Sequence, residues 1–180
     1  MEGFDIEACL ESMEILVDTR EQPSDRAKKR YQLFECPYQR ATLNYGDYTY
    51  NFTLPNGSKY FDTSQTVLGD VVIERKMSLE ELSGCFCQSR DRFCNEFERA
   101  KSHGAKIYLL TENASWEKLM AHHYRTQFNP KAFLASITSF CARYNITPIF
   151  CKEETSGKLI KEILYRELKE RLTLGKYDGD

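Results

Sequence analysis

The chain has 180 residues, of which 41% are hydrophobic and 29% are charged. This composition is typical of one folded domain and excludes an intrinsically disordered chain. The sequence contains no run of about 18 apolar residues and begins with an acidic segment, so it predicts neither a membrane span nor a signal peptide.

The net charge of −2 conceals an uneven distribution. Residues 1–14 carry five acids and no base, whereas residues 15–177 carry 25 bases against 20 acids. The larger segment therefore permits phosphate binding without requiring it. Bases gather at residues 26–30 and 90–101, and the alternative is that both clusters are solvated faces.

Cysteine usage bears on the cellular compartment. Seven cysteines at irregular spacing disfavour the disulfide framework of a secreted protein. Cys85, Cys87 and Cys94 lack the paired spacing of a zinc site. We expect reduced, packed thiols in a cytoplasmic protein, with a soft-metal or redox role as the alternative.

The first half of the chain reads as strands. A hairpin turn is predicted at Asn56-Gly57, and the segments on both sides have the alternation or the β-branched content of strands. The predicted strands are, in chain order, residues 14–18, 41–54, 59–62 and 67–76.

From Ser78 onward the pattern becomes helical, because Ser78 and Glu81 form a capping box. The expected elements are a helix over 78–87, a helix over 91–103, a strand over 106–111, a short helix from 115, a helix over 130–145, a strand over 146–151 and a helix over 156–173. Strands that first form a meander and then alternate with helices predict an α/β domain, with a mixed sheet flanked by helices.

Acids stand at the ends of three predicted strands, in VDTREQ (residues 17–22), YGDY (45–48) and VVIERK (71–76). Because strand side chains alternate, Glu74 and Lys76 share a face and Arg75 points the other way. Glu74 and Lys76 are about 7 Å apart along the strand, a spacing that suits a carboxylate on a hard cation such as Mg²⁺ with an ammonium beside it. The alternative is a surface ion pair.

Two further acids compete as the partner of Glu74. Asp70 has the same parity, but it lies about 13 Å away along an extended strand. We expect Asp70 to begin the strand or to support the ligands from behind. Asp47 belongs to a neighbouring strand of the meander, so it is the preferred metal partner.

Three motifs resemble those of the nuclease domain of the XPF family of structure-specific DNA endonucleases. Residues 17–21 (VDTRE), 46–47 (GD) and 74–76 (ERK) correspond to the family's V-D-x-R-E, G-D and E-R-K segments. The resemblance covers about residues 13–173. We therefore expect a nuclease domain over 13–173, an acidic extension over 1–12 and a tail over 174–180.

The resemblance implies a restriction-endonuclease-like fold and hydrolysis of phosphodiester bonds in DNA with Mg²⁺ or Mn²⁺. Branched, flapped or single-strand-containing DNA in repair, recombination or replication is the expected substrate. The implied metal ligands are Glu21, Asp47 and Glu74, and Lys76 would orient water and stabilise charge on the phosphate. The other residues implied to complete the site are Asp18, Arg20 and Arg75.

Four bases are candidates for contacts with the DNA backbone, namely Arg90, Arg92, Lys28 and Lys29. Glu80 occupies the position of the family's last aspartate and, like Asp70, is expected behind the ligands. The sequence lacks the tandem helix-hairpin-helix and helicase regions of many members, so a preferred DNA structure is not carried over. A stand-alone enzyme of this kind would suit a phage or a bacterium.

Two other functions stay open. A catalytically silent DNA-binding or partner-recruiting domain has no need of the intact acidic set, which is costly without a cation. A homodimer through the C-terminal segment 130–173 would use the apolar stripe between Leu159 and Leu172, unless that stripe packs on its own sheet.

Overall fold

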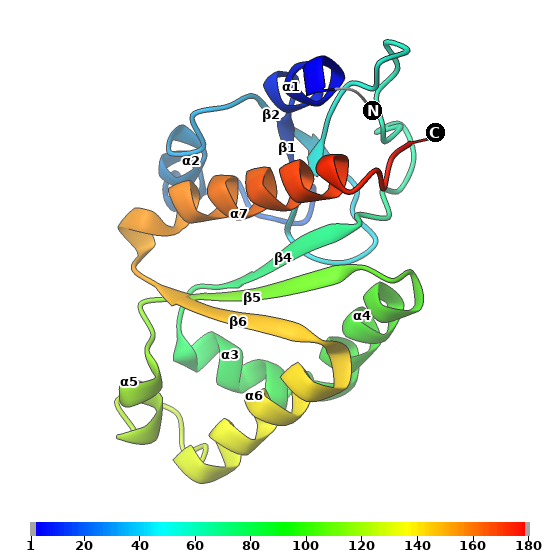
Figure 1. Cartoon of the computed structure of the whole chain (residues 1–180). Helices are drawn as coiled ribbons and strands as arrows, with labels where there is room; N and C mark the ends of the chain where they lie inside the picture. The colour runs from blue at the N-terminus through cyan, green and yellow to red at the C-terminus, as the bar shows by residue number, and fades with distance from the viewer. Residues whose placement is uncertain (1–2, 179–180) are drawn as a thin grey trace.

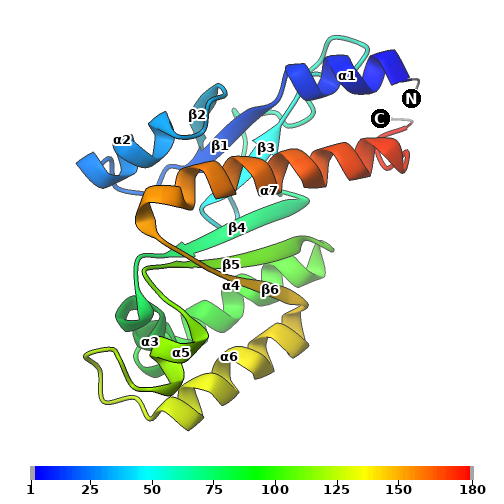
Figure 2. The ribbon, with the colours of Figure 1, turned by 60° about the vertical axis from the view of Figure 1, so that its left-hand side comes forward.

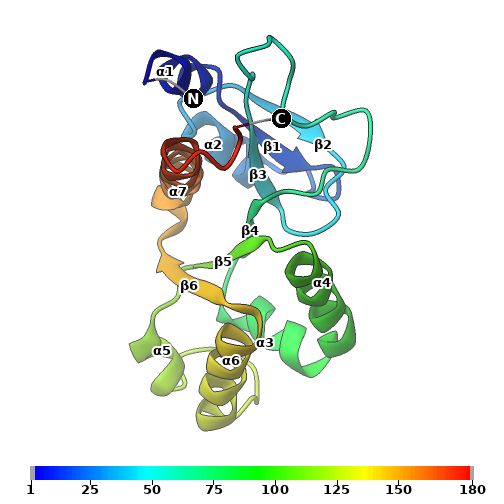
Figure 3. The same ribbon diagram turned by 45° about the vertical axis from the view of Figure 1, so that its right-hand side comes forward.

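The computed structural model describes residues 3–178, which form a six-stranded mixed sheet in the order β2-β1-β3-β4-β5-β6. The strands are β1 (Glu14–Asp18), β2 (Tyr38–Ala41), β3 (Tyr48–Asn51), β4 (Val71–Lys76), β5 (Lys106–Glu112) and β6 (Ile146–Cys151). β3 is antiparallel to both neighbours, whereas β1–β2 and β4–β5–β6 are parallel. The sheet twists strongly from β2 to β6 (Figure 3).

Helices cover both faces of the sheet (Figure 1). They are α1 (Gly3–Glu11), α2 (Asp25–Gln32), α3 (Leu79–Cys87), α4 (Arg90–Ser102), α5 (Trp116–Met120), α6 (Pro130–Tyr144) and α7 (Glu153–Thr173). α1, α2 and α7 share one core with β1, β3 and β4, and α7 runs along these strands in Figure 2. α3, α4 and α6 share the other core with β5.

The apolar stripe of the last helix, α7, packs against the sheet. The α7 side chains Ile160, Leu164, Leu168 and Leu172 are buried in the first core. Of the two uses predicted for this apolar stripe, the structure therefore shows packing on the chain's own sheet. The α/β class with a mixed sheet between helices is confirmed.

The predicted meander is wrong in detail. Only residues 48–51 of the expected strand over 41–54 form β3, and residues 59–62 form no strand apart from a bridge between Thr53 and Lys59. Asn51 explains the interruption, because its Oδ1 accepts hydrogen bonds from the backbone N–H groups of Phe52 and Phe61. A side chain thereby satisfies groups that a strand ladder would otherwise pair.

Three elements were not predicted, namely α1, α2 and β2. α2 has Ser24 as its N-cap, whose Oγ accepts from the N–H of Ala27 at 3.2 Å. Its buried side chains are only Ala27, Arg30 and Tyr31, a stripe too narrow to give an apolar period. The basic cluster at 26–30 is thus not simply a solvated face, because Arg30 is 4% exposed.

The predicted domain bounds of 12–13 and 173–174 stay a prediction. α1 and Tyr177 nevertheless belong to the same core as α7. The Tyr177 hydroxyl donates to Asp70 Oδ2 at 3.0 Å. All seven cysteines are free thiols, and no helix within residues 3–178 has the length and apolar character that a membrane crossing needs.

Candidate active site

A cleft of about 310 Å³ opens at the C-terminal end of β4. It is bordered by the loop after β1, the turn before β3, and helix α4. The residues that line it are Arg20, Glu21, Gln22, Ser24, Asp47, Glu74, Arg75, Lys76, Glu81, Arg92 and Glu96. A smaller cavity of about 210 Å³ continues it toward Cys85 and Phe93. Most of the chain's predicted site residues therefore meet at one place.

Glu74 and Lys76 form the floor of the cleft. They are 4% and 9% exposed, and their side chains form an ion pair on the same face of β4. The Lys76 ammonium also lies 5.5 Å from the centre of the Phe93 ring. Alternation along the strand predicts this geometry and turns Arg75 to the opposite face.

Asp47 is brought to this floor by the turn before β3. The backbone N–H of Arg75 donates to Asp47 Oδ2 at 2.7 Å, and the N–H of Asp47 donates to the carbonyl of Ile73 at 2.9 Å. The carbonyl of Asp47 accepts from the N–H of Asp18 at 2.9 Å. Asp47 is thus fixed between β1 and β4, and within residues 3–178 no hydrogen bond reaches its Oδ1.

The buried charges of the cleft do not balance. Burial raises the pKa of Asp47 to about 6. Burial, followed by repulsion from Asp47, raises the pKa of Glu74 to about 8. Burial acts to lower the pKa of Lys76, but the charges of Glu74 and Asp47 outweigh it, so the pKa of Lys76 is raised. One ammonium therefore faces two carboxylates that resist full ionisation.

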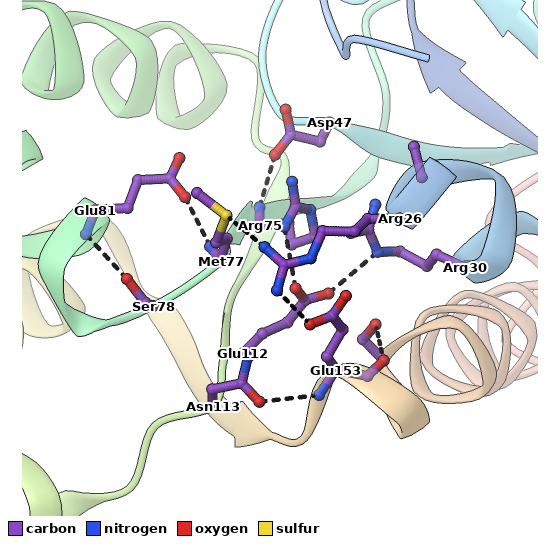
Figure 4. Close-up of polar contacts among 12 residues, drawn as sticks. Arg26, Arg30, Asp47, Arg75, Met77, Ser78, Glu81, Glu112, Asn113 and Glu153 are labelled. Atoms are coloured by element: carbon purple, nitrogen blue, oxygen red, sulfur yellow. Dashed lines mark hydrogen bonds and ion pairs between the residues drawn. The ribbon is translucent and has the colours of Figure 1, made fainter. Parts of the chain in front are cut away.

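Glu21 and Glu112 alternate with two arginines in a buried ring that borders the cleft at Glu21 and Arg75. Arg30 donates to Glu21 Oε1 at 2.7 Å and to Glu112 Oε1 at 3.1 Å. Arg75 donates to Glu112 Oε2 at 3.2 Å and has a nitrogen 3.5 Å from Glu21 Oε1. Figure 4 shows Arg30 and Arg75 converging on Glu112. The ring joins α2, β4, β5 and the loop after β1.

The ring alters the expectation for Glu21. Its Oε2 also accepts from the hydroxyls of Tyr31 and Tyr48, so protein donors already occupy both of its oxygens. Within residues 3–178, no three His, Cys, Asp or Glu side chains are close enough to hold one metal ion. The structure therefore does not bring Glu21, Asp47 and Glu74 together as one ligand cluster.

Asp18 braces the backbone and does not line the cleft. It is 1% exposed, and its Oδ1 accepts from the backbone N–H of Arg20 at 2.6 Å and from Arg20 Nε at 2.7 Å. Its Oδ2 accepts from the N–H of Leu43 at 2.9 Å. Asp18 thereby holds Arg20, which is 51% exposed by side chain, at the rim of the cleft.

Asp70 and Glu80 do not reach the cleft. Asp70 lies at the opposite end of β4, where it accepts hydrogen bonds from Tyr60 and Tyr177. Glu80 accepts from the N–H of Arg125 at 3.0 Å. The next residue, Glu81, lines the cleft instead, because one step along a helix turns the side chain by about 100°. Glu81 also accepts from the N–H of Met77 at 2.7 Å (Figure 4).

The four predicted DNA-contacting bases are spread over two helices. Arg92 of α4 lines the cleft. The guanidinium of Arg90 lies 5.8 Å from the centre of the Phe140 ring, outside the cleft. Lys28 and Lys29 are exposed on α2, where Lys28 lies 3.6 Å from Asp25.

Sequence reasoning missed Arg30, Glu96 and Glu112 as parts of this site. Glu112 could have been found, because it ends β5, whose parallel neighbour β4 carries Glu74–Lys76 to the same sheet edge. Arg30 and Glu96 lie on helices whose packing brings them in, and no local pattern indicates this.

A family model now decides the classification, since the ERCC4 domain matches residues 17–163. The chain belongs to the ERCC4 domain family. Membership confirms the resemblance to XPF-type nucleases and supports a nuclease or DNA-binding role in general. No curated protein sequence matches the chain.

Two solved structures share the ERCC4 fold seen here. XPF from Aeropyrum pernix has a TM-score of 0.58 at 17% identity, over 86% of this chain and 61% of that one. XPF from Aeropyrum pernix in complex with DNA has a TM-score of 0.57 at 17% identity, over 93% and 75%. The present chain thus spans 61% of the first protein's length, and the likeness shows the fold.

Proposed function

We propose that this ERCC4 domain is a metal-dependent DNA endonuclease whose active site is the cleft at the end of β4. The observation that carries the proposal is the buried pair Asp47 and Glu74 beside Lys76. Two carboxylates with raised pKa values in one cleft are typical of a catalytic site.

A silent DNA-binding domain is the alternative function. Such a domain gains nothing from burying two acids that repel each other, whereas a nuclease gains a site at which a bound divalent cation relieves the repulsion. The cleft therefore favours the enzyme over the silent domain.

The donor set fits a hard divalent cation. Asp47 and Glu74 supply carboxylate oxygens, and Mg²⁺ commonly takes one or two carboxylates and leaves its other positions to water and phosphate oxygens. When bound, Mg²⁺ or Mn²⁺ would supply Lewis-acid stabilisation of phosphate charge and a more acidic water. Glu21 is reserved for the buried ring, where it fixes the loop after β1.

The bases have separate roles in this proposal. Lys76 keeps its proton because Glu74 and Asp47 raise its pKa, so it acts as a hydrogen-bond donor to a phosphate oxygen and stabilises developing negative charge. Arg20 and Arg92, at the rim of the cleft, attract the DNA backbone. Lys28, Lys29 and Arg90 lie outside the cleft and would contact more distant phosphates.

We keep branched, flapped or single-strand-containing DNA as the proposed substrate, and repair, recombination or replication inside the cell as the setting. The homodimer through residues 130–173 also stays a prediction. Its apolar stripe is already used in the chain's own core, so dimerisation would need other side chains. Light scattering of the purified protein measures its oligomeric state directly.

The test is a panel of end-labelled branched, nicked and duplex DNAs incubated with Mg²⁺, Mn²⁺ or EDTA. We expect metal-dependent cleavage of a branched or single-strand-containing DNA. Glu74→Ala and Lys76→Ala should each lower the rate by about 100-fold or more. Glu80→Ala, which removes an acid outside the cleft, is the matched control and should retain activity. Equal cleavage by all variants, with contaminants excluded, would overturn the site.

A further inference from the structure

Glu96 is an acid of the cleft whose role differs from those of Asp47 and Glu74. It projects from α4, a helix anchored in the second core by Phe93, Phe97 and Ala100. Its Oε1 accepts a hydrogen bond from the backbone N–H of Gly46 at 3.0 Å. Its charge acts on two other residues of the cleft, because it contributes to the raised pKa values of Glu74 and Arg20.

The residue that Glu96 contacts immediately precedes Asp47. Gly46 has φ +74°, and a Cβ at this position would lie 2.8 Å from Cβ of Val72. The turn is therefore pressed against β4, and its N–H groups must be satisfied locally. The N–H of Asp47 is satisfied by Ile73, whereas that of Gly46 depends on Glu96.

Helix α4 holds the turn at a second point. Arg99, one helical turn after Glu96, donates to the carbonyl of Asn44 at 3.2 Å. The turn carrying Asp47 is thus tied to α4 by a side-chain acceptor and a side-chain donor. A rigid helix thereby sets the position of a short loop.

We propose that Glu96 is a positioning residue that holds Asp47 in place by accepting the Gly46 N–H. This inference rests on the proposed function, because it assigns Asp47 to the active site. The required property is the acceptor oxygen and not the negative charge. Glu96 commits its Oε1 to the backbone N–H of Gly46.

The distinction between acceptor and charge can be tested with two substitutions. Glu96→Gln keeps an acceptor oxygen and removes the charge, whereas Glu96→Ala removes both. Glu98→Gln and Glu98→Ala are matched controls, because Glu98 is exposed on the same helix and does not line the cleft. The full chain is used throughout.

Three readouts apply to each variant: amide hydrogen exchange at Gly46, calorimetric titration with Mn²⁺, and single-turnover cleavage of a labelled DNA. Glu96→Ala should speed exchange at Gly46, weaken Mn²⁺ binding and lower the cleavage rate about 10- to 100-fold, with DNA binding unchanged. Glu96→Gln should stay within about threefold of the parent protein in all three.

Two results would overturn the assignment. One is normal Gly46 protection and normal Mn²⁺ binding in Glu96→Ala. The other is an equal loss in Glu96→Gln and Glu96→Ala, which would make the charge the important property. If the parent protein cuts no DNA, the proposed function fails, while amide exchange still decides whether Glu96 anchors the turn.

Discussion

At the scale of single residues, the cleft places opposite demands on stability and function. Asp47 and Glu74 lie together in a buried position, where each disfavours the charge of the other. A domain optimised for stability alone would have a neutral residue in place of one of them. Such a cost in stability is common at catalytic sites. The pair should therefore measurably lower the free energy of unfolding when both acids are charged and no metal is bound.

The first prediction concerns pH. Because the pKa values of Asp47 and Glu74 are raised to about 6 and about 8 on folding, the folded state binds these protons more tightly than the unfolded state. Their contribution to stability is complete below their ordinary pKa values of about 4 and is lost as pH rises through about 6 and then about 8.

Urea unfolding in EDTA measures this effect. Asp47→Asn removes one charge, so it should be more stable than the parent protein by about 1–3 kcal/mol near pH 8.5, with the difference closing near pH 5. Asp91→Asn, an exposed change on α4, is the control and should show no such pH-dependent gain. Equal stability of Asp47→Asn and the parent at high pH would contradict the charge imbalance.

The second prediction concerns the buried ring. Glu112→Gln leaves Arg30 and Arg75 short of one buried negative charge, so it should destabilise the fold by about 3–5 kcal/mol. Glu153→Gln breaks the surface pair between Arg26 and Glu153 (Figure 4) and should cost at most about 1 kcal/mol. Similar unfolding midpoints for the two variants would show that the ring does not act as a buried network.

At the scale of elements, strand and turn geometry bring the site together. β4 supplies a rigid end that carries Glu74 and Lys76, and the Gly46 turn brings Asp47 to it. The turn needs glycine because its φ is positive and the space for a Cβ is filled by Val72. The alternation of side chains along a strand predicts that Glu74 and Lys76 share one face of β4. It does not predict the close contact between the Gly46 turn and the strand.

The third prediction separates these two constraints on Gly46. Gly57 also has a positive φ, of +86°, but nothing lies within 4 Å of its would-be Cβ. Gly57→Ala should cost about 1–2 kcal/mol for the left-handed backbone alone. Gly46→Ala should cost more, because the backbone near Asp47 must also shift, and it should lower DNA cleavage. Thermal unfolding compares the two, and equal costs would contradict the close packing of the turn.

At the scale of the whole molecule, the sequence predicted the class of fold, most helices and the strands β1, β4, β5 and β6. It missed α1, and over residues 19–70 it was right only for β3, because α2, β2 and irregular loops replace the rest of the predicted meander. Arg30 shows the reason, because its buried guanidinium pairs with Glu112 at the end of β5, which is 82 residues away in the sequence. Local sequence patterns do not predict contacts between segments so far apart in the chain.

The candidate site, like the fold, was predicted where local patterns determine it and missed where tertiary packing determines it. Glu74 and Lys76 follow from alternation, and Asp47 from its motif and its place near a strand end. The occupation of Glu21 by Arg30, Tyr31 and Tyr48, and the arrival of Glu96 from α4, depend on tertiary packing. The site residues that sequence reasoning missed, Arg30, Glu96 and Glu112, are therefore those that hold the acids in place.

The most direct measurement is the single-turnover cleavage rate of a labelled splayed-arm DNA in Mg²⁺ by the parent protein and by Lys76→Ala. Lys118→Ala, which removes an exposed lysine outside the cleft, is the control. If the active site lies at the end of β4, metal-dependent cleavage should fall about 100-fold or more in Lys76→Ala and little in Lys118→Ala. Cleavage that persists in EDTA, or that is unchanged in Lys76→Ala, would contradict it.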